Sequence, residues 1–156
     1  MNIDAVSQHV ELCLRHLMEN LDMRALLALT HRHAPAGQAA LDLIMPILTE
    51  KTELRWPVLH NAFPSPRLTI DLFAASSAAL VGVDPWTERG IEVAITHVSD
   101  SLRAPREQLD RLLQSVILQH TTPLQLAAVM HVLGKKRCLA RLERVEAAFH
   151  RAQMIG

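Results

Sequence analysis

Apolar residues recur three and four places apart along most of this sequence, and that spacing limits the fold more than any other feature. Residues separated by three or four positions share one face of an α-helix, so each such run predicts an amphipathic helix. The stripe of Ile91, Ile95 and Val98 is the clearest example. Runs of the same kind cover residues 4–29, 41–48, 68–81, 84–102, 105–117, 122–133 and 135–152.

The composition favours helices that pack on one another. Hydrophobic residues make up 49% of the 156 residues, whereas aromatic residues make up 3% and tyrosine is missing. Leu, Val, Ile, Ala and Met side chains must therefore fill the core, and these interlock along helix faces. A chain of this length is large enough to bury one core. We expect a single all-α domain over residues 1–156, built as a bundle of six or seven helices.

Short motifs indicate where several helices begin and end. The sequence DPWTE at residues 84–88 sets a capping carboxylate before a proline, and TPLQ at residues 122–125 matches a capping box; both predict helix starts. Gly82 and Gly134 are placed to end helices. Residues 67–73, RLTIDLF, alternate as a strand would, but the small residues that follow favour a helix.

The longest irregular segment covers about residues 52–66, TELRWPVLHNAFPSP, which holds three prolines and no sustained period. It nevertheless contains Trp56 and Phe63. A loop with such large apolar side chains either packs on the bundle or offers them to another molecule. Trp56 and Phe63 are therefore candidate partner-binding residues.

Charge is distributed unevenly, although the net charge is zero. Residues 1–102 hold seven Lys and Arg against twelve Asp and Glu, whereas residues 103–156 hold nine against four. A neutral domain with this layout can present a basic face to an anionic partner, or it can neutralise itself within the fold or across a homodimer.

The last predicted helix carries a narrow apolar seam beside a basic flank. The seam residues fall close to one line along the helix, and they are Cys138, Leu142, Val145, Phe149 and Ala152. Such a seam is either part of the core or the contact of a homodimer through the C-terminal helix.

Basic residues gather on one flank of the same helix and at its start. We call this set the basic ridge: Lys135, Lys136, Arg137, Arg141 and Arg144. The planar fork of arginine suits two-point contacts with carboxylates or phosphates, so the ridge is predicted to bind an acidic protein surface. In the alternative interpretation, these side chains cover the edges of the seam while their charged ends stay in water.

Nucleic acid is the alternative anionic partner. Residues 124–145 have the rough form of a helix-turn-helix, with Ala127 and Ala128 in the first helix and a basic second helix. The glycine expected four places after the packed alanine is missing, and Gly134 comes too late. Aromatic residues for base stacking are also scarce in this half of the chain.

A small metal-binding helical protein is the third alternative. His9, Cys13 and His16 share one helix face at spacings that suit zinc. Cys13 also belongs to an apolar stripe, which favours a structural role for the group, so no metal and no cofactor is predicted. Cys13 and Cys138 each lie in an apolar stripe outside any C-x-x-C motif, which predicts two buried thiols.

The sequence holds no G-x-S-x-G, P-loop, G-x-G-x-x-G or H-E-x-x-H motif, so we expect no enzymatic activity. Charged residues interrupt every apolar run before the roughly 18 residues that a membrane span needs, and no secretion signal opens the chain. We therefore expect a cytoplasmic, non-catalytic regulator, adaptor or inhibitor. Its partner would be a protein that meets the basic ridge together with Trp56 and Phe63.

Overall fold

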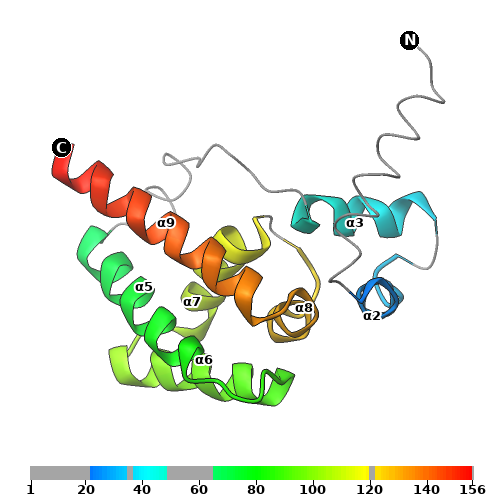
Figure 1. Ribbon diagram of the computed structural model, residues 1–156, viewed down its shortest axis with the longest axis horizontal. Helices are drawn as coiled ribbons and strands as arrows, with labels where there is room; N and C mark the ends of the chain where they lie inside the picture. Colours follow the sequence, from blue (N-terminus) through cyan, green and yellow to red (C-terminus); the bar gives the residue numbers. More distant parts are fainter. Residues whose placement is uncertain (1–21, 35–36, 49–64, 120–121, 156) are drawn as a thin grey trace, which may run out of the picture.

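The computed structural model describes residues 22–34, 37–48, 65–119 and 122–155 (Figure 1). Within these ranges the chain forms helices and no strand, so the predicted all-α class is confirmed. The helices are α2 Met23–Thr30, α3 Gln38–Leu48, α5 Pro66–Val81, α6 Glu88–Leu102, α7 Arg106–Leu113, α8 Leu126–Leu133 and α9 Lys135–Ile155. A π-helical segment, η1 Gln114–Leu118, continues α7.

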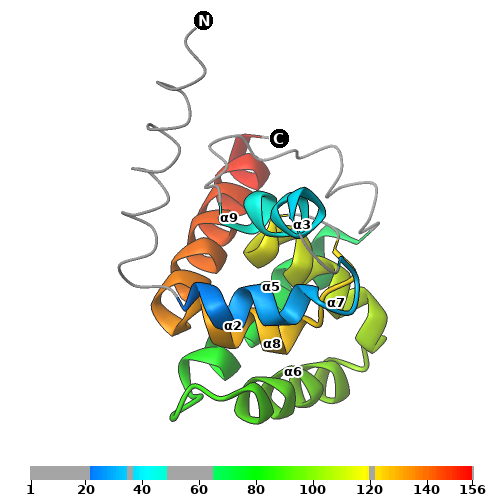
Figure 2. The ribbon, with the colours of Figure 1, turned by 90° about the vertical axis from the view of Figure 1, so that its right-hand side faces the viewer.

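Helix α8 lies at the centre of the bundle, where it contacts α2, α6, α9 and η1. In Figure 1, α9 and α5 lie on one side of it and α2 and α3 on the other; Figure 2 shows α2 lying alongside α8. Most residues of α8 are themselves apolar and buried: Leu126, Ala127, Ala128, Val129, Met130 and Leu133. A helix that is apolar on all sides avoids water only in the interior, which explains its place.

Helix α6 confirms the clearest predicted stripe but begins later than predicted. Ile91, Ile95 and Val98 are buried on its inner face. Its N-cap is Thr87, whose side chain accepts a 3.1 Å hydrogen bond from the Gly90 amide, so the expectation that residue 84 caps this helix is wrong. Residues 84–87 instead belong to the connection between α5 and α6. Trp86 in this connection donates a 3.0 Å hydrogen bond from Nε1 to the Met130 carbonyl of α8, which holds the segment against that helix.

Helix α5 resolves the ambiguous segment in favour of a helix. Ser65 caps it by accepting a hydrogen bond from the Leu68 amide, and Pro66 occupies the first turn, where no amide hydrogen is needed. The helix ends at Val81 with Gly82 as its C-cap, as predicted. Only the end of the irregular segment of residues 52–66 falls within the described ranges, and Trp56 and Phe63 lie outside them.

Helix α2 contains the end of the first predicted stripe. Asp22 is its N-cap and accepts a 3.1 Å hydrogen bond from the Ala25 amide. Because Asp22 has non-helical dihedral angles, the stripe predicted over residues 4–29 does not form one unbroken helix up to Leu29.

The junction between α8 and α9 is a single residue. Gly134 has a φ of 88° and ends α8, and α9 begins at the next residue, so the predicted stop is confirmed. Helix α8 itself begins at Leu126 with Gln125 in extended conformation, so the start predicted at residues 122–125 is wrong. The Thr122 hydroxyl accepts instead from the Leu124 amide in the preceding turn.

Candidate partner-binding surfaces

The apolar seam of α9 packs inside the chain. Its members Cys138, Leu142, Val145 and Phe149 are all buried by residues of the same chain. The Phe149 ring meets the Phe73 ring of α5 with 5.9 Å between centroids and a tilt of 53° between planes. These four residues therefore belong to the core and are not available as the contact of a homodimer.

Cys138 is a buried free thiol, as predicted, whereas Cys13 lies outside the described residues. The Sγ of Cys138 donates to the Met130 carbonyl at 3.5 Å. Burial raises the pKa of the Cys138 thiol to about 12, while the nearby Arg141 and Arg137 charges act in the opposite direction. A thiol that stays protonated and covered is not a candidate nucleophile.

Arg141 does not project from an exposed ridge. It is 2% exposed, and its Nη1 donates a 2.6 Å hydrogen bond to the Ile117 carbonyl oxygen of η1. The last carbonyls of a helical segment lack partners within that segment, so a donor from α9 satisfies one of them. The prediction of an exposed Arg141 is therefore wrong, because its guanidinium has a partner inside the protein.

Two further members of the basic ridge, Arg144 and Lys135, also donate hydrogen bonds to other parts of the bundle. Arg144 is exposed, and its Nη2 donates to Oε1 of Gln119 at 3.3 Å. Lys135 donates from Nζ to the carbonyl oxygens of Val81 and Val83, both at 2.7 Å. Val81 is the last residue of α5, whose terminal carbonyls lack partners within the helix, and Val83 follows it, so Lys135 fastens the start of α9 to the end of α5 and the segment after it.

Arg137 and Lys136 complete the ridge. Arg137 is half-buried, and its Nη1 is covered yet has no hydrogen-bond acceptor among the described residues. Lys136 beside it is exposed. A covered N–H without an acceptor has a free-energy cost, so among the described residues Arg137 is the ridge member with a buried donor left unsatisfied.

The remaining predicted site residues lie outside the described ranges: Trp56, Phe63, His9, Cys13 and His16. Within those ranges, no three His, Cys, Asp or Glu side chains come together as a metal site would require. The helix-turn-helix interpretation gains no support from α8 and α9. Gly134 alone joins the two helices, and Lys135, at the start of the second, is held by α5.

A groove between α5 and α6 was not predicted from the sequence. It has a volume of about 690 Å³ and is lined mainly by small apolar residues. Val93, on its wall, is 62% exposed, and Val81, next to its lining residue Gly82, is 53% exposed. The available sequence signal was the position of Val93, about 200° around the helix from Ile91 and therefore off the buried stripe.

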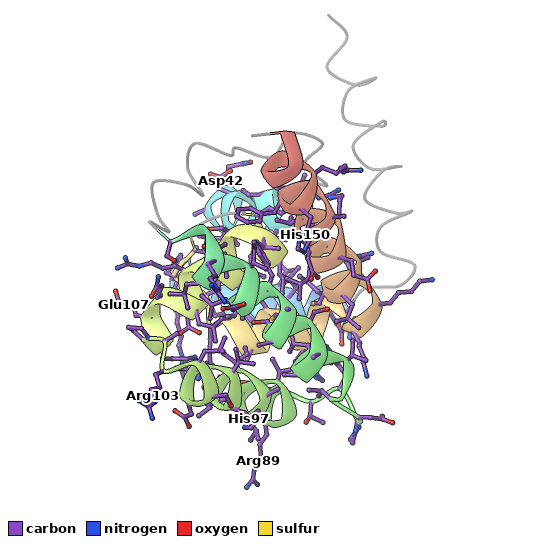
Figure 3. The ribbon with its side chains drawn as sticks, turned by 90° about the vertical axis from the view of Figure 1, so that its left-hand side faces the viewer. Asp42, Arg89, His97, Arg103, Glu107 and His150 are labelled. Atoms are coloured by element: carbon purple, nitrogen blue, oxygen red, sulfur yellow. The ribbon has the colours of Figure 1, made fainter. Side chains whose placement is uncertain are left out.

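The rim of this groove carries charges of both signs. Asp84, from the segment before α6, and Arg89 and His97, from α6, are among its lining residues. In Figure 3 the Arg89 side chain extends from α6 away from the other helices. Asp84 and Arg89 are both exposed.

A second hollow of about 380 Å³ lies where α2, α6 and α8 approach one another. Arg32, His33, Glu88 and Gln125 contribute its polar lining, and all four residues are exposed. Its charges are mixed and solvated, which gives it no preference for one kind of ligand.

No protein-family model matches this sequence, and no curated protein matches it. None of the helices that the structure describes combines the length and the apolar character needed to cross a membrane. Function is therefore inferred from the side chains and surfaces of this chain.

Proposed function

We propose that the chain is a cytoplasmic, non-catalytic protein-interaction module, a small regulator, adaptor or inhibitor, and that it binds an acidic protein segment at the start of α9. The observation that supports this most is the covered Nη1 of Arg137, which has no acceptor among the described residues. The side chain is half-buried, and a partner carboxylate that displaced the groups covering Nη1 would give this guanidinium the two-point contact that its planar fork favours.

The surroundings of Arg137 also favour an anion. Arg141 lies one helical turn away, and both guanidinium groups are close enough to act on the Cys138 thiol. Like charges at this spacing repel each other, and an incoming carboxylate relieves that repulsion. Lys136, exposed at the same end of the helix, adds a charge that speeds encounter with an acidic surface.

The proposal keeps only part of the predicted ridge. Lys135 and Arg141 hold the bundle together, so changing them would disturb the fold as well as any binding. Arg137 and Lys136 are the residues at which binding can be tested without removing a hydrogen bond of the bundle. Trp56 and Phe63 stay predicted anchors for the same partner.

The test has a capture step and a variant step. Native lysate, with and without nuclease treatment, is passed over the full chain, and the affinity of each captured protein is then measured by calorimetry. Arg137→Met should raise the Kd by about tenfold or more, since a charged contact is lost, while the free energy of unfolding of the variant stays equal or rises. Arg67→Met, which removes an exposed arginine from α5, is the matched control and should leave both quantities unchanged.

Two results would contradict the proposal. Equal affinity of wild type and Arg137→Met would show that Arg137 does not contact the partner. Captured material that disappears after nuclease treatment would identify nucleic acid as the partner, and its affinity would then fall steeply as salt is raised.

A further inference from the structure

The groove between α5 and α6 is lined mainly by apolar residues, and one of them, Val93, is largely exposed. Among the described residues, the large hydrophobic side chains with the highest exposure are Val93 and Val81. Val93 lines the groove, and Val81 precedes its lining residue Gly82 in the chain. Elsewhere on α6 the apolar residues Ile91 and Ile95 are buried. Exposed apolar side chains that gather around a hollow mark a surface that another surface covers.

The charges at the rim indicate what that other surface is. Asp84 and Arg89 have opposite charges and stand at the same groove. The ion pairs of the described residues are formed by Arg106 and Arg111 with neighbouring acids, and neither Asp84 nor Arg89 takes part in them. Both charges are thus open to a second molecule.

A two-fold dimer places one patch against its own copy, so a residue i that contacts j is matched by a j that contacts i. A patch with both a carboxylate and a guanidinium at its edge is complementary to itself, whereas a patch of one sign would repel its copy. The zero net charge of the whole chain also leaves no general repulsion to oppose self-association.

We propose that the α5–α6 groove is the interface of a homodimer, in which Asp84 of one protomer meets Arg89 of the other and Val93 packs across the two-fold axis. This interface is separate from the predicted dimer through the C-terminal helix, whose seam is buried within the chain. It is also independent of partner binding at Arg137, because the groove is lined by α5, α6 and the loop between them.

Sedimentation equilibrium of the full chain, from low micromolar to several hundred micromolar, tests the interface. The wild type should show a monomer–dimer equilibrium. Asp84→Lys and Arg89→Glu should each weaken the dimer by about tenfold or more, because each change sets like charges opposite one another twice in a symmetric dimer. The double variant Asp84→Lys with Arg89→Glu restores opposite charges and should return the dissociation constant to within about threefold of wild type.

Two further variants separate the interface from general effects. Val93→Glu should leave the chain monomeric, because it buries a carboxylate in an apolar contact. Asp100→Lys alters net charge as Asp84→Lys does but lies at the other end of α6, and it should dimerise like wild type. Circular dichroism of each variant confirms that it is folded.

Three outcomes would overturn the proposal. A wild type that is monomeric at every concentration would show that the groove serves another molecule or none. A double variant no better than the single ones would place any dimer contact elsewhere. An Asp100→Lys variant as impaired as Asp84→Lys would show that net charge, and no specific pair, controls association.

Discussion

The Arg141 guanidinium of α9 donates from Nη1 to the carbonyl oxygen of Ile117 in η1 across 2.6 Å, and the arginine is buried where the contact forms. A hydrogen bond from a charged donor is stronger than one between neutral groups, and it is not weakened by water in this position. The bond joins the long C-terminal helix to a π-helical segment 24 residues earlier in the chain. Arg141 is thus a structural member of the bundle interior.

Replacing this arginine should lower stability. Arg141→Leu keeps an apolar stem but leaves the Ile117 carbonyl without its donor, so we expect the free energy of unfolding to fall by about 1–3 kcal/mol. Urea denaturation followed by circular dichroism measures the change. Arg67→Leu, at an exposed site, should stay within about 0.5 kcal/mol of wild type. Equal stability of the two variants would mean that the Arg141 contact contributes nothing.

The Trp86 side chain should fix the loop before α6 through one bond. Trp86→Phe keeps an aromatic ring but removes Nε1, the donor to the Met130 carbonyl, so a loss of about 1–2 kcal/mol is expected. Thermal unfolding at several scan rates, with a check of reversibility, gives the measurement. A variant that melts with wild type would show that the indole is held by packing alone.

Two glycine substitutions should differ in their effect for a backbone reason. Gly134 has a φ of 88° and a ψ of 152°, a region that other residues rarely adopt, so Gly134→Ala should cost about 1–3 kcal/mol although no atom lies within 4 Å of an added Cβ. Gly82 has a φ of −75°, and its added Cβ would make ordinary contacts of 3.5 Å or more. Gly82→Ala should therefore be neutral or slightly stabilising in denaturation experiments. A reversed order would contradict this account of the α8–α9 junction.

Stability should decline at high pH because of Cys138. Burial raises its pKa to about 12 in the folded protein from the 9.0 of an exposed thiol, so the unfolded chain loses the thiol proton first as pH rises. The contribution is fully present below pH 9, and it falls away between pH 9 and 12 by up to about 1.4 kcal/mol per pH unit. Urea denaturation at a series of pH values measures the slope. In the Cys138→Ala variant the free energy of unfolding should fall less steeply between pH 9 and 12, whatever its value at neutral pH. Equal slopes in the variant and the wild type would show that Cys138 does not cause the decline.

Native labelling gives a second measure of the same residue. Iodoacetamide should modify Cys138 only as fast as the protein opens, because the reactive thiolate is absent and the sulfur is covered. Mass spectrometry after digestion distinguishes Cys138 from Cys13. Rapid modification of Cys138 under native conditions would show that α9 detaches locally.

Helix identity could be predicted from the sequence, because the apolar spacing of each described helix matches its buried face. Helix starts were harder, and the two proline-containing motifs show why. The motif at residues 84–88 fits the local rules for a helix cap, yet Trp86 hydrogen-bonds to the Met130 carbonyl, 44 residues further along the chain. The motif at residues 122–125 forms a turn instead of a helix start, because Thr122 bonds to the Leu124 amide. At residues 84–88 the local preference yields to a tertiary contact, whereas at residues 122–125 one local arrangement replaces another.

The basic ridge shows the same limit for a surface. Helical spacing places Arg137, Arg141 and Arg144 on one flank, and nothing in that spacing separates a guanidinium in water from one that meets a carbonyl. The partner of Arg141 is the Ile117 carbonyl of a π-helical segment, which no sequence pattern foretold. The groove was missed because its lining residues come from two helices and the loop between them, and the spacing within one helix does not show which residues of another helix lie beside it.

The position of α8 inside the bundle has a consequence for how the protein opens. Helix α8 packs against α2, α6, α9 and η1, and its residues other than His131 and Val132 are buried, so solvent reaches most of its amides only after several helices separate. Amide hydrogens in such a place exchange with deuterium through complete unfolding, at a rate set by the full free energy of unfolding. The amide exchange of α8 would thus report the global stability of the whole domain.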